Sequence, residues 1–259
     1  MPDQLPGGEN WLWLGGSLLL AILWTNASWL FRQPRSIPGG ESIARIAASQ
    51  YAPWLLHLVR LLYYVGLPAA AFLLGQDAII RRYLGLQVDQ ADPWRDWAYD
   101  VGWAAALGFG TLALLALGWW TYRRAVIAAT GEPHTITGWE TSGWAQLREA
   151  AFHEIHWTFY RNLPVVLLRP DAYWGAWIGL LLVGLEAALN PSWRAALGDP
   201  SKALPQLTRS ALAVSSCLLF LLTPNGNLWL AIVAHWGVSW AMTALAGVHR
   251  PEPVTAYTP

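Results

Sequence analysis

The chain has 259 residues, of which 55% are hydrophobic and 12% charged, and its mean hydropathy is +0.31. This composition is too apolar and too poor in charge for an ordinary soluble domain. The formal net charge is zero and the chain has no basic block, which argues against a nucleic acid as its partner. The single cysteine, Cys217, excludes intrachain disulfides and cysteine-based zinc sites.

Apolar runs in the first half of the chain predict three membrane-spanning helices, since about 20 apolar residues suffice to cross the hydrocarbon core. The first run follows Asp3 and Glu9 rather than basic residues and has no small-residue cleavage site, so we expect a retained span and not a signal peptide. The second run carries His57 and Arg60 one helical turn apart, and we expect Arg60 to snorkel or to be paired. The three runs are residues 11–31, 53–74 and 99–122.

The second half of the chain predicts four further helices, of which the first is the most polar. They occupy residues 148–168, 172–189, 207–222 and 228–248. Loops rich in turn formers separate them at residues 131–143, 190–205 and 223–227. The sequence therefore predicts an all-α polytopic transmembrane helix bundle of about seven spans. We expect N-terminal transmembrane helices in residues 1–130 and a C-terminal helical region with the polar residues in 131–259.

Trp and basic residues lie at the ends of these predicted spans. Many of the 19 Trp residues fall near the ends of apolar runs, where the indole ring suits the membrane interface. The positive-inside rule places the N-terminus outside and the C-terminus inside, so we expect an integral protein of a bacterial cytoplasmic membrane, in contact with lipid. The basic residues on the cytoplasmic side are then Arg32, Arg35, Arg45, Arg123, Arg124, Arg194, Lys202 and Arg250.

The segment 148–164, REAAFHEIHWTFYRNLP, concentrates ionisable residues in a chain that is otherwise mostly apolar. Each residue of a helix advances by about 100°, so Glu154 and Arg161, which are seven apart, share a face. His156 lies within about a turn of Glu154. Ionisable groups at membrane depth are costly unless they pair, bind a metal or line a wet cavity. The segment is therefore either an intramembrane site or an interfacial helix with a solvated polar face.

Two further ionisable residues lie on apolar spans, Glu186 on the fifth and His235 on the seventh. Imidazole and carboxylate groups are ligands of zinc and similar metals, and they also activate water as general bases. His156, Glu186 and His235 form a candidate site for zinc or another divalent metal, and a site without metal stays open. Separate hydrogen bonds would also account for them, with Glu186 accepting from a hydroxyl or Trp N–H and His235 donating to a backbone carbonyl.

The order of these sites resembles a known family. A polar helix ends in Phe159-Tyr160-Arg161, an apolar span carries Glu186, and the segment 225–236, NGNLWLAIVAHW, leads from a turn through Leu-Trp to His235. This layout resembles the CPBP family, the CAAX-protease and bacteriocin-processing intramembrane endopeptidases of the Ras-converting-enzyme type. The likeness covers residues 147–248, and Arg161 and His235 match the family motifs outright.

The remaining motif positions differ from the family pattern. The first family motif is Glu-Glu-x-x-x-Arg, and alignment on Arg161 places His156 and Trp157 at the two Glu positions, with Glu154 two residues upstream. The second motif is Phe-x-x-x-His, and Glu186 stands in place of its His. The third motif often has Asn four residues after its His, where this chain has Ser239. Glu and His are thus exchanged between the first two motifs.

The resemblance implies a metal-dependent intramembrane endopeptidase that cleaves a peptide, a prenylated peptide or a membrane protein. In this hypothesis Glu154 or His156 activates water, His235 with Glu186 binds a metal or stabilises the oxyanion, and Arg161 orients the carboxylate. Two other hypotheses stay open. The chain is a non-catalytic protein of the same fold that binds a partner or assembles a complex, or it is a haem or quinone redox subunit with histidine ligands.

Overall fold

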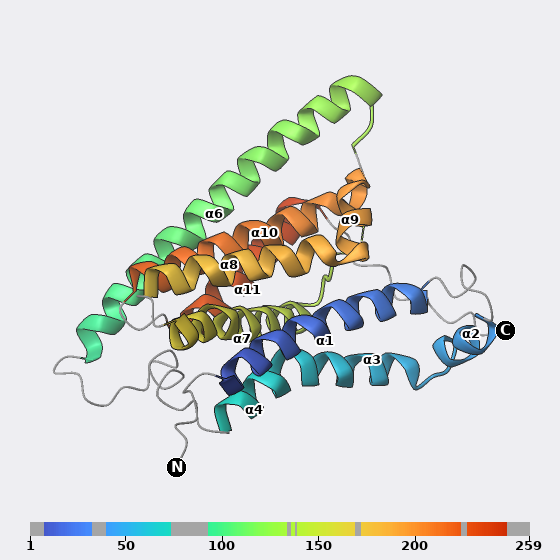
Figure 1. Ribbon diagram of the computed structural model, residues 1–259. Helices are drawn as coiled ribbons and strands as arrows, with labels where there is room; N and C mark the ends of the chain where they lie inside the picture. The colour runs from blue at the N-terminus through green and yellow to red at the C-terminus, as the bar shows by residue number, and fades with distance from the viewer. Residues whose placement is uncertain are drawn as a thin grey trace, which may run out of the picture.

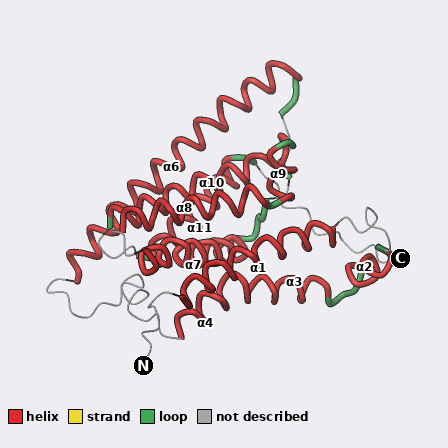
Figure 2. Tube along the Cα trace, viewed as in Figure 1, coloured by secondary structure: helices red, strands yellow, loops and turns green. Residues whose placement is uncertain are grey.

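The computed structural model describes residues 8–32, 40–73, 93–133, 136–137, 139–168, 172–223 and 227–247. These residues form helices, turns and loops and no strand, as Figure 2 shows, so the all-α prediction is confirmed. The described parts of six predicted spans fall mainly on one helix each, and the remaining one, 53–74, is divided over three consecutive helical elements. In chain order the elements are α1 (Gly8–Arg32), α2 (Glu41–Ala47), α3 (Ala52–Leu61), the π-helical turn η2 (Leu62–Gly66), α4 (Leu67–Leu73), α6 (Pro93–Thr130), α7 (Gly143–Leu168), α8 (Ala172–Leu189), α9 (Pro191–Leu197), α10 (Pro200–Leu222) and α11 (Leu228–Leu245).

Within the described residues, five helical segments are long and apolar enough to cross a membrane. The bent pair α8 and α9, which meet at 80°, raises the number to six if the pair forms one span. These candidates fit an integral membrane protein. Two helices account for the difference from the predicted number. Helix α8 counts only together with α9, and α7 is long enough at 26 residues but carries the charged segment.

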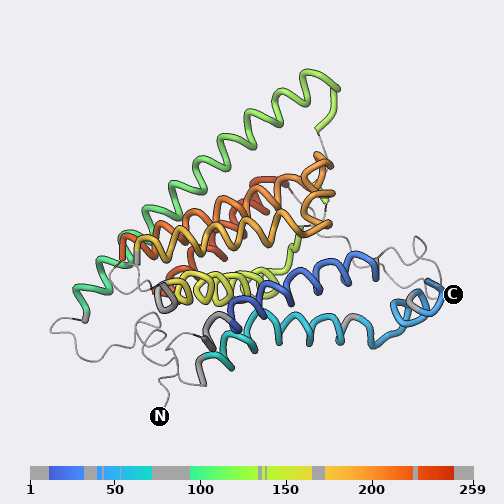
Figure 3. The backbone as a smooth tube through the Cα atoms, in the orientation of Figure 1, coloured from blue at the N-terminus to red at the C-terminus, as the bar shows by residue number. Residues whose placement is uncertain are grey.

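The polar helix α7 lies in the middle of the bundle. It contacts α8, α11, α1, η2 and α4. Figures 1 and 3 show this arrangement, with α8, α10 and α11 above α7 and with α1 and α3 below it. The long helix α6 packs on α10 and α11 and then extends beyond them. The helices before Thr130 therefore pack directly against the C-terminal region that carries the polar residues.

The prediction of a loop at residues 190–205 is wrong. Asn190 accepts a hydrogen bond from the Ser192 amide at 2.9 Å and caps α9, and Asp199 accepts one from the Ser201 amide at 3.0 Å and caps α10. A proline follows each cap at the first helical position, where its missing N–H costs nothing. The two prolines therefore begin helices and do not mark a loop. Arg35, Arg250 and residues 224–226 of the predicted turn lie outside the described residues.

Candidate functional site

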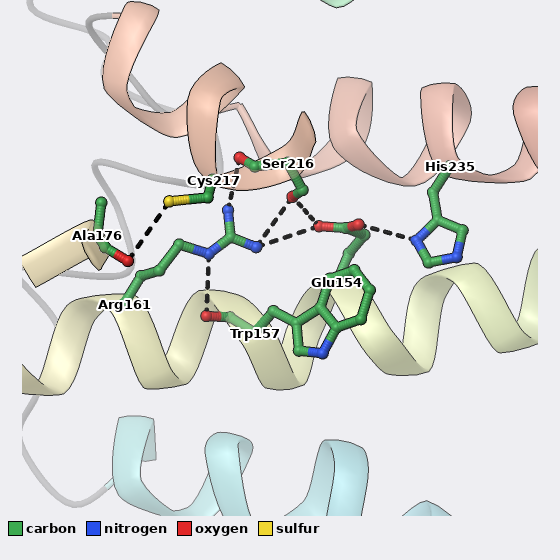
Figure 4. A network of polar contacts seen from close by, with 7 residues as sticks. All are labelled: Glu154, Trp157, Arg161, Ala176, Ser216, Cys217 and His235. Carbon is green, nitrogen blue, oxygen red and sulfur yellow. Dashed lines mark hydrogen bonds and ion pairs between the residues drawn. The ribbon is translucent and has the colours of Figure 1, made fainter. Parts of the chain in front are cut away.

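Glu154 of α7 is the centre of a buried polar network that joins three helices (Figure 4). Its Oε1 lies 2.9 Å from Nδ1 of His235 on α11. Its Oε2 accepts hydrogen bonds from Nη2 of Arg161, at 3.3 Å, and from the hydroxyl of Ser216 on α10. The predicted common face of Glu154 and Arg161 is confirmed by this contact, which spans about two turns of α7.

Arg161 is held by several acceptors besides Glu154. Its Nε donates to the carbonyl of Trp157 at 3.1 Å, and its Nη1 donates to the carbonyl of Ser216 at 2.8 Å. The backbone of α8 approaches this arginine closely at Gly179, where an added Cβ would lie 2.7 Å from the Arg161 Cα. The lack of a side chain at Gly179 therefore permits α7 and α8 to pack together at the level of the network.

The carboxylate at the centre of the network is not exposed to solvent. Glu154 is 0% exposed, Arg161 4% and His235 6%. Charges at this depth are tolerated when each has a partner and further hydrogen bonds. Because Glu154 bonds through both oxygens, it fixes the orientation of the guanidinium and of the imidazole together.

A second network lies on a different side of α7. Nε2 of His156 lies 2.9 Å from Oε2 of Glu186 on α8 and 2.7 Å from the hydroxyl of Tyr63. Tyr63 is buried on the π-helical turn η2, and such turns often occur where a helix adapts to a functional or structural site. Glu154 and His156 are two residues apart, which rotates them by about 200° around the helix axis. The two networks therefore face different neighbours, α10 and α11 for Glu154 and η2 and α8 for His156.

This arrangement separates the three candidate metal ligands. His156 and Glu186 contact each other, whereas His235 contacts Glu154 in the other network. Among the described residues, no group of three or more His, Cys, Asp or Glu side chains is arranged to hold a metal ion. On one side of α7 only His156 and Glu186 are close enough to share a metal ion. On the other side, both carboxylate oxygens of Glu154 already take part in hydrogen bonds within the protein. The structure does not bring His156, Glu186 and His235 to one point.

A cavity of about 710 Å³ reaches the Glu154 network from one end of the bundle. Among its lining residues are His153 and His235, and Glu154 lies behind His235 and does not line it. The rings of His153 and His235 are nearly parallel, at 5° with centroids 5.7 Å apart, and both contact the ring of Trp157. The buried Nδ1 of His153 makes no hydrogen bond to the described residues. Two imidazoles thus lie side by side in the wall of the cavity.

Two residues of the networks, Ser216 and Tyr63, and one residue of the cavity wall, His153, were not among the predicted catalytic or metal-binding residues. His153 precedes Glu154 directly, so its place beside the site was open to prediction from helix geometry alone. Ser216 is one of several serines in α10, and nothing in the sequence distinguishes it. Tyr63 depends on the π-helical turn, which has no clear sequence signal.

Comparisons with protein-family models, with curated proteins and with solved structures give no match to this chain.

Proposed function

We propose that the chain is an integral membrane hydrolase of CPBP type, in which His235 activates water for attack on a peptide bond. The observation that carries the proposal is the contact between Glu154 and His235 at 2.9 Å, at the wall of a cavity that enters an otherwise apolar bundle. A carboxylate that accepts from Nδ1 of an imidazole fixes the tautomer and leaves Nε2 as the base. Nε2 of His235 makes no hydrogen bond to the described residues.

The steps follow from this orientation. Nε2 of His235 takes a proton from water as the oxygen attacks the carbonyl carbon of the scissile peptide bond. Glu154 stabilises the imidazolium that forms, and Arg161 with Ser216 holds the carboxylate in place. The imidazolium then returns the proton to the leaving amine as the C–N bond breaks. General acid–base catalysis of this kind contributes about 10²–10⁴-fold to the rate.

This proposal assigns the base differently from the sequence analysis. Both oxygens of Glu154 are occupied by hydrogen bonds, and His156 belongs to the network on the other side of α7. His235 is the ionisable member of the Glu154 network that lines the cavity. His153 lies beside it at the same wall and is available to donate a hydrogen bond to the developing oxyanion.

The test compares membranes from cells that produce the wild type, the His235→Ala variant or the Thr121→Ala variant. New protein N-termini, identified by mass spectrometry, should appear with the wild type and with Thr121→Ala and should fall about 100-fold or more with His235→Ala. Thr121 is a suitable control because it is exposed, lies outside the cavity lining and bonds only to a carbonyl of its own helix. Equal sets of N-termini from the wild type and His235→Ala would exclude the proposal.

A non-catalytic role is the second candidate, and a specific observation favours it. The Glu154 network ties α7 to α10 and α11, and the Glu186 network ties α7 to α8 and η2, so both stabilise the bundle without any reaction. In that case His235→Ala would lower the free energy of unfolding and leave the set of N-termini unchanged. The protein would then bind a membrane partner or support an assembly.

We also propose the orientation with the N-terminus outside a bacterial cytoplasmic membrane. The C-terminal end of α6, with Arg123 and Arg124, lies at the same end of the bundle as α9 and the start of α10, which carry Arg194 and Lys202 (Figure 1). Such an excess of basic residues favours the cytoplasmic side. A cysteine introduced by Arg194→Cys should react with an impermeant maleimide in inverted vesicles and not in intact cells. The reverse pattern would reverse the orientation.

A further inference from the structure

The cavity that ends at His153 and His235 is lined by more cationic than anionic side chains. Three arginines reach it, Arg60 from α3, Arg148 from α7 and Arg209 from α10. Glu149 is the carboxylate beside them, and it is shared, since it accepts two hydrogen bonds from Arg60 and a third from Arg148 at 3.4 Å. The cavity is lined by one further acid, Glu140, which is exposed and accepts from the Ser142 amide.

Arg209 is the guanidinium for which the described residues provide no carboxylate. Its Nη1 donates to Oε1 of Gln206, one turn earlier on α10, at 3.2 Å, and no acid lies within ion-pair distance of it in the described part of the chain. Arg209 is partly buried and lies nine residues after the start of α10, about 13 Å along the helix. A cation at such a depth is costly unless an anion or water compensates it.

Thr208, the residue before Arg209, carries a second polar group that the described residues leave without a partner. Thr208 is 2% exposed, it lines the same cavity, and its hydroxyl makes no hydrogen bond to any described residue. Buried hydroxyls usually have a partner, because an unpaired one forfeits its hydrogen bonds to water. Arg209 and Thr208 together offer a guanidinium and a hydroxyl, which is a donor set suited to the oxygens of a phosphate or carboxylate.

We propose that this cavity binds an oxyanion, a phosphate group, with Arg209 as its cationic ligand and Thr208 as a neutral hydrogen-bond donor. The cavity, at about 710 Å³, has the volume of a small-molecule site. Trp24, Trp139 and Trp193 also line it and provide apolar contact for the rest of the ligand. The oxyanion belongs either to a lipid headgroup or to a soluble ion. The site does not depend on hydrolysis by His235.

The experiment measures the unfolding temperature of the full chain in nonionic detergent with three probes. Inorganic phosphate at constant ionic strength tests the soluble ion, and phosphatidylglycerol in mixed micelles tests the headgroup, with phosphatidylcholine as the neutral lipid. A ligand that binds the folded state raises the unfolding temperature. We expect phosphate, phosphatidylglycerol or both to raise it, and the probe that does so identifies the source of the oxyanion. No response to either probe overturns the proposal.

The variant Arg209→Gln, with Arg194→Gln as its control, locates the site. Arg209→Gln should raise the half-saturating concentration of the active probe at least tenfold. Arg194→Gln removes the same charge from an exposed position at the same end of the bundle, outside the cavity lining, and should respond as the wild type does. An equal loss in both variants, or an unchanged response of Arg209→Gln, contradicts the proposal because the effect would then be one of net charge or of another site.

Gln206→Glu provides an independent test if Arg209→Gln does not fold. The substitution keeps the shape of the side chain and places a carboxylate 3.2 Å from the guanidinium. The built-in acid should raise the unfolding temperature without ligand and abolish the response to the probe. A wild-type response in Gln206→Glu overturns the assignment of Arg209. His235→Ala should keep the response, so failure of the hydrolase proposal leaves this result standing.

Discussion

Replacing Glu154 tests the central network most directly. Its buried carboxylate is bonded to Arg161, Ser216 and His235, and Glu154→Ala leaves a guanidinium and an imidazole without that acceptor. Removing one partner of a buried ion pair costs about 3–5 kcal/mol. Arg161 keeps the carbonyl oxygens of Trp157 and Ser216 as acceptors. We therefore expect the low end, a loss of about 3 kcal/mol in the free energy of unfolding.

The assay is reversible unfolding in mixed micelles, in which increasing SDS replaces a nonionic detergent and helix packing is followed by Trp fluorescence. Glu154→Gln is the matched variant, because its amide oxygen keeps one acceptor and the shape of the side chain, and it should lose less stability than Glu154→Ala. A loss below about 0.5 kcal/mol for Glu154→Ala, which is typical of surface substitutions, would refute the network.

A double-mutant cycle extends the same assay to the separation of the two networks. Glu154→Ala combined with His235→Ala should show a coupling energy of about 0.5–3 kcal/mol, as for other residues in one hydrogen-bond network. Glu154→Ala combined with Glu186→Ala should be additive within about 0.5 kcal/mol, because these carboxylates belong to networks on different sides of α7. A coupling energy above this limit between Glu154 and Glu186 would contradict the separation and support one shared site.

Two other features make predictions that stability measurements check. Gly179→Ala places a Cβ 2.7 Å from the α7 backbone and should lower the free energy of unfolding by about 1–3 kcal/mol, whereas Gly184→Ala on the same helix meets nothing within 4 Å and should leave it unchanged or raise it. Equal effects of the two would contradict the close α7–α8 contact. The pKa of Asp199 is lowered from about 3.8 to about 2, mainly by its hydrogen bond with the neighbouring lysine. Because the pKa is lower in the folded state, the ionised Asp199 stabilises the fold at pH values above about 4, and this stabilisation is lost as the pH falls towards 2. Asp199→Asn should therefore reduce the change in stability between about pH 4 and about pH 2. An acid-unfolding curve identical to that of the wild type would contradict the effect of Asp199.

Periodicity and length sufficed to predict the long helices but not α9, and helix geometry sufficed to predict the contact between Glu154 and Arg161. Residues on one helix have a fixed angular relation, so their common face is readable from spacing. The partners of Glu186 and His235 were beyond this reasoning. Spacing along one chain says nothing about how neighbouring helices rotate around their axes, and a rotation of α8 or α11 decides which face of α7 each side chain meets.

The same limit explains why one shared metal site was predicted and two networks are found. Each of the ionisable groups that the sequence analysis selected has a partner in the structure. The inference that they meet at one point assumed that polar groups on adjacent helices converge. His156 and Glu154 cannot both face the same neighbour, because two residues of a helix turn by about 200°. The structure therefore pairs His156 with Glu186 and Glu154 with His235, where the sequence analysis expected one shared site.

The polar helix α7 also shows why hydropathy alone is a poor guide to the centre of a membrane bundle. Hydropathy ranks a helix by its own residues, whereas the cost of a charge in the membrane depends on whether another helix satisfies it. Glu149 meets Arg60 of α3, Glu154 meets His235 of α11, and His156 meets Glu186 of α8. Many apolar residues of the surrounding helices are exposed on the outside of the bundle, among them Leu19, Trp54, Leu114, Leu181 and Trp229. The chain thus concentrates ionisable groups on α7 and satisfies them with partners from the helices that surround it.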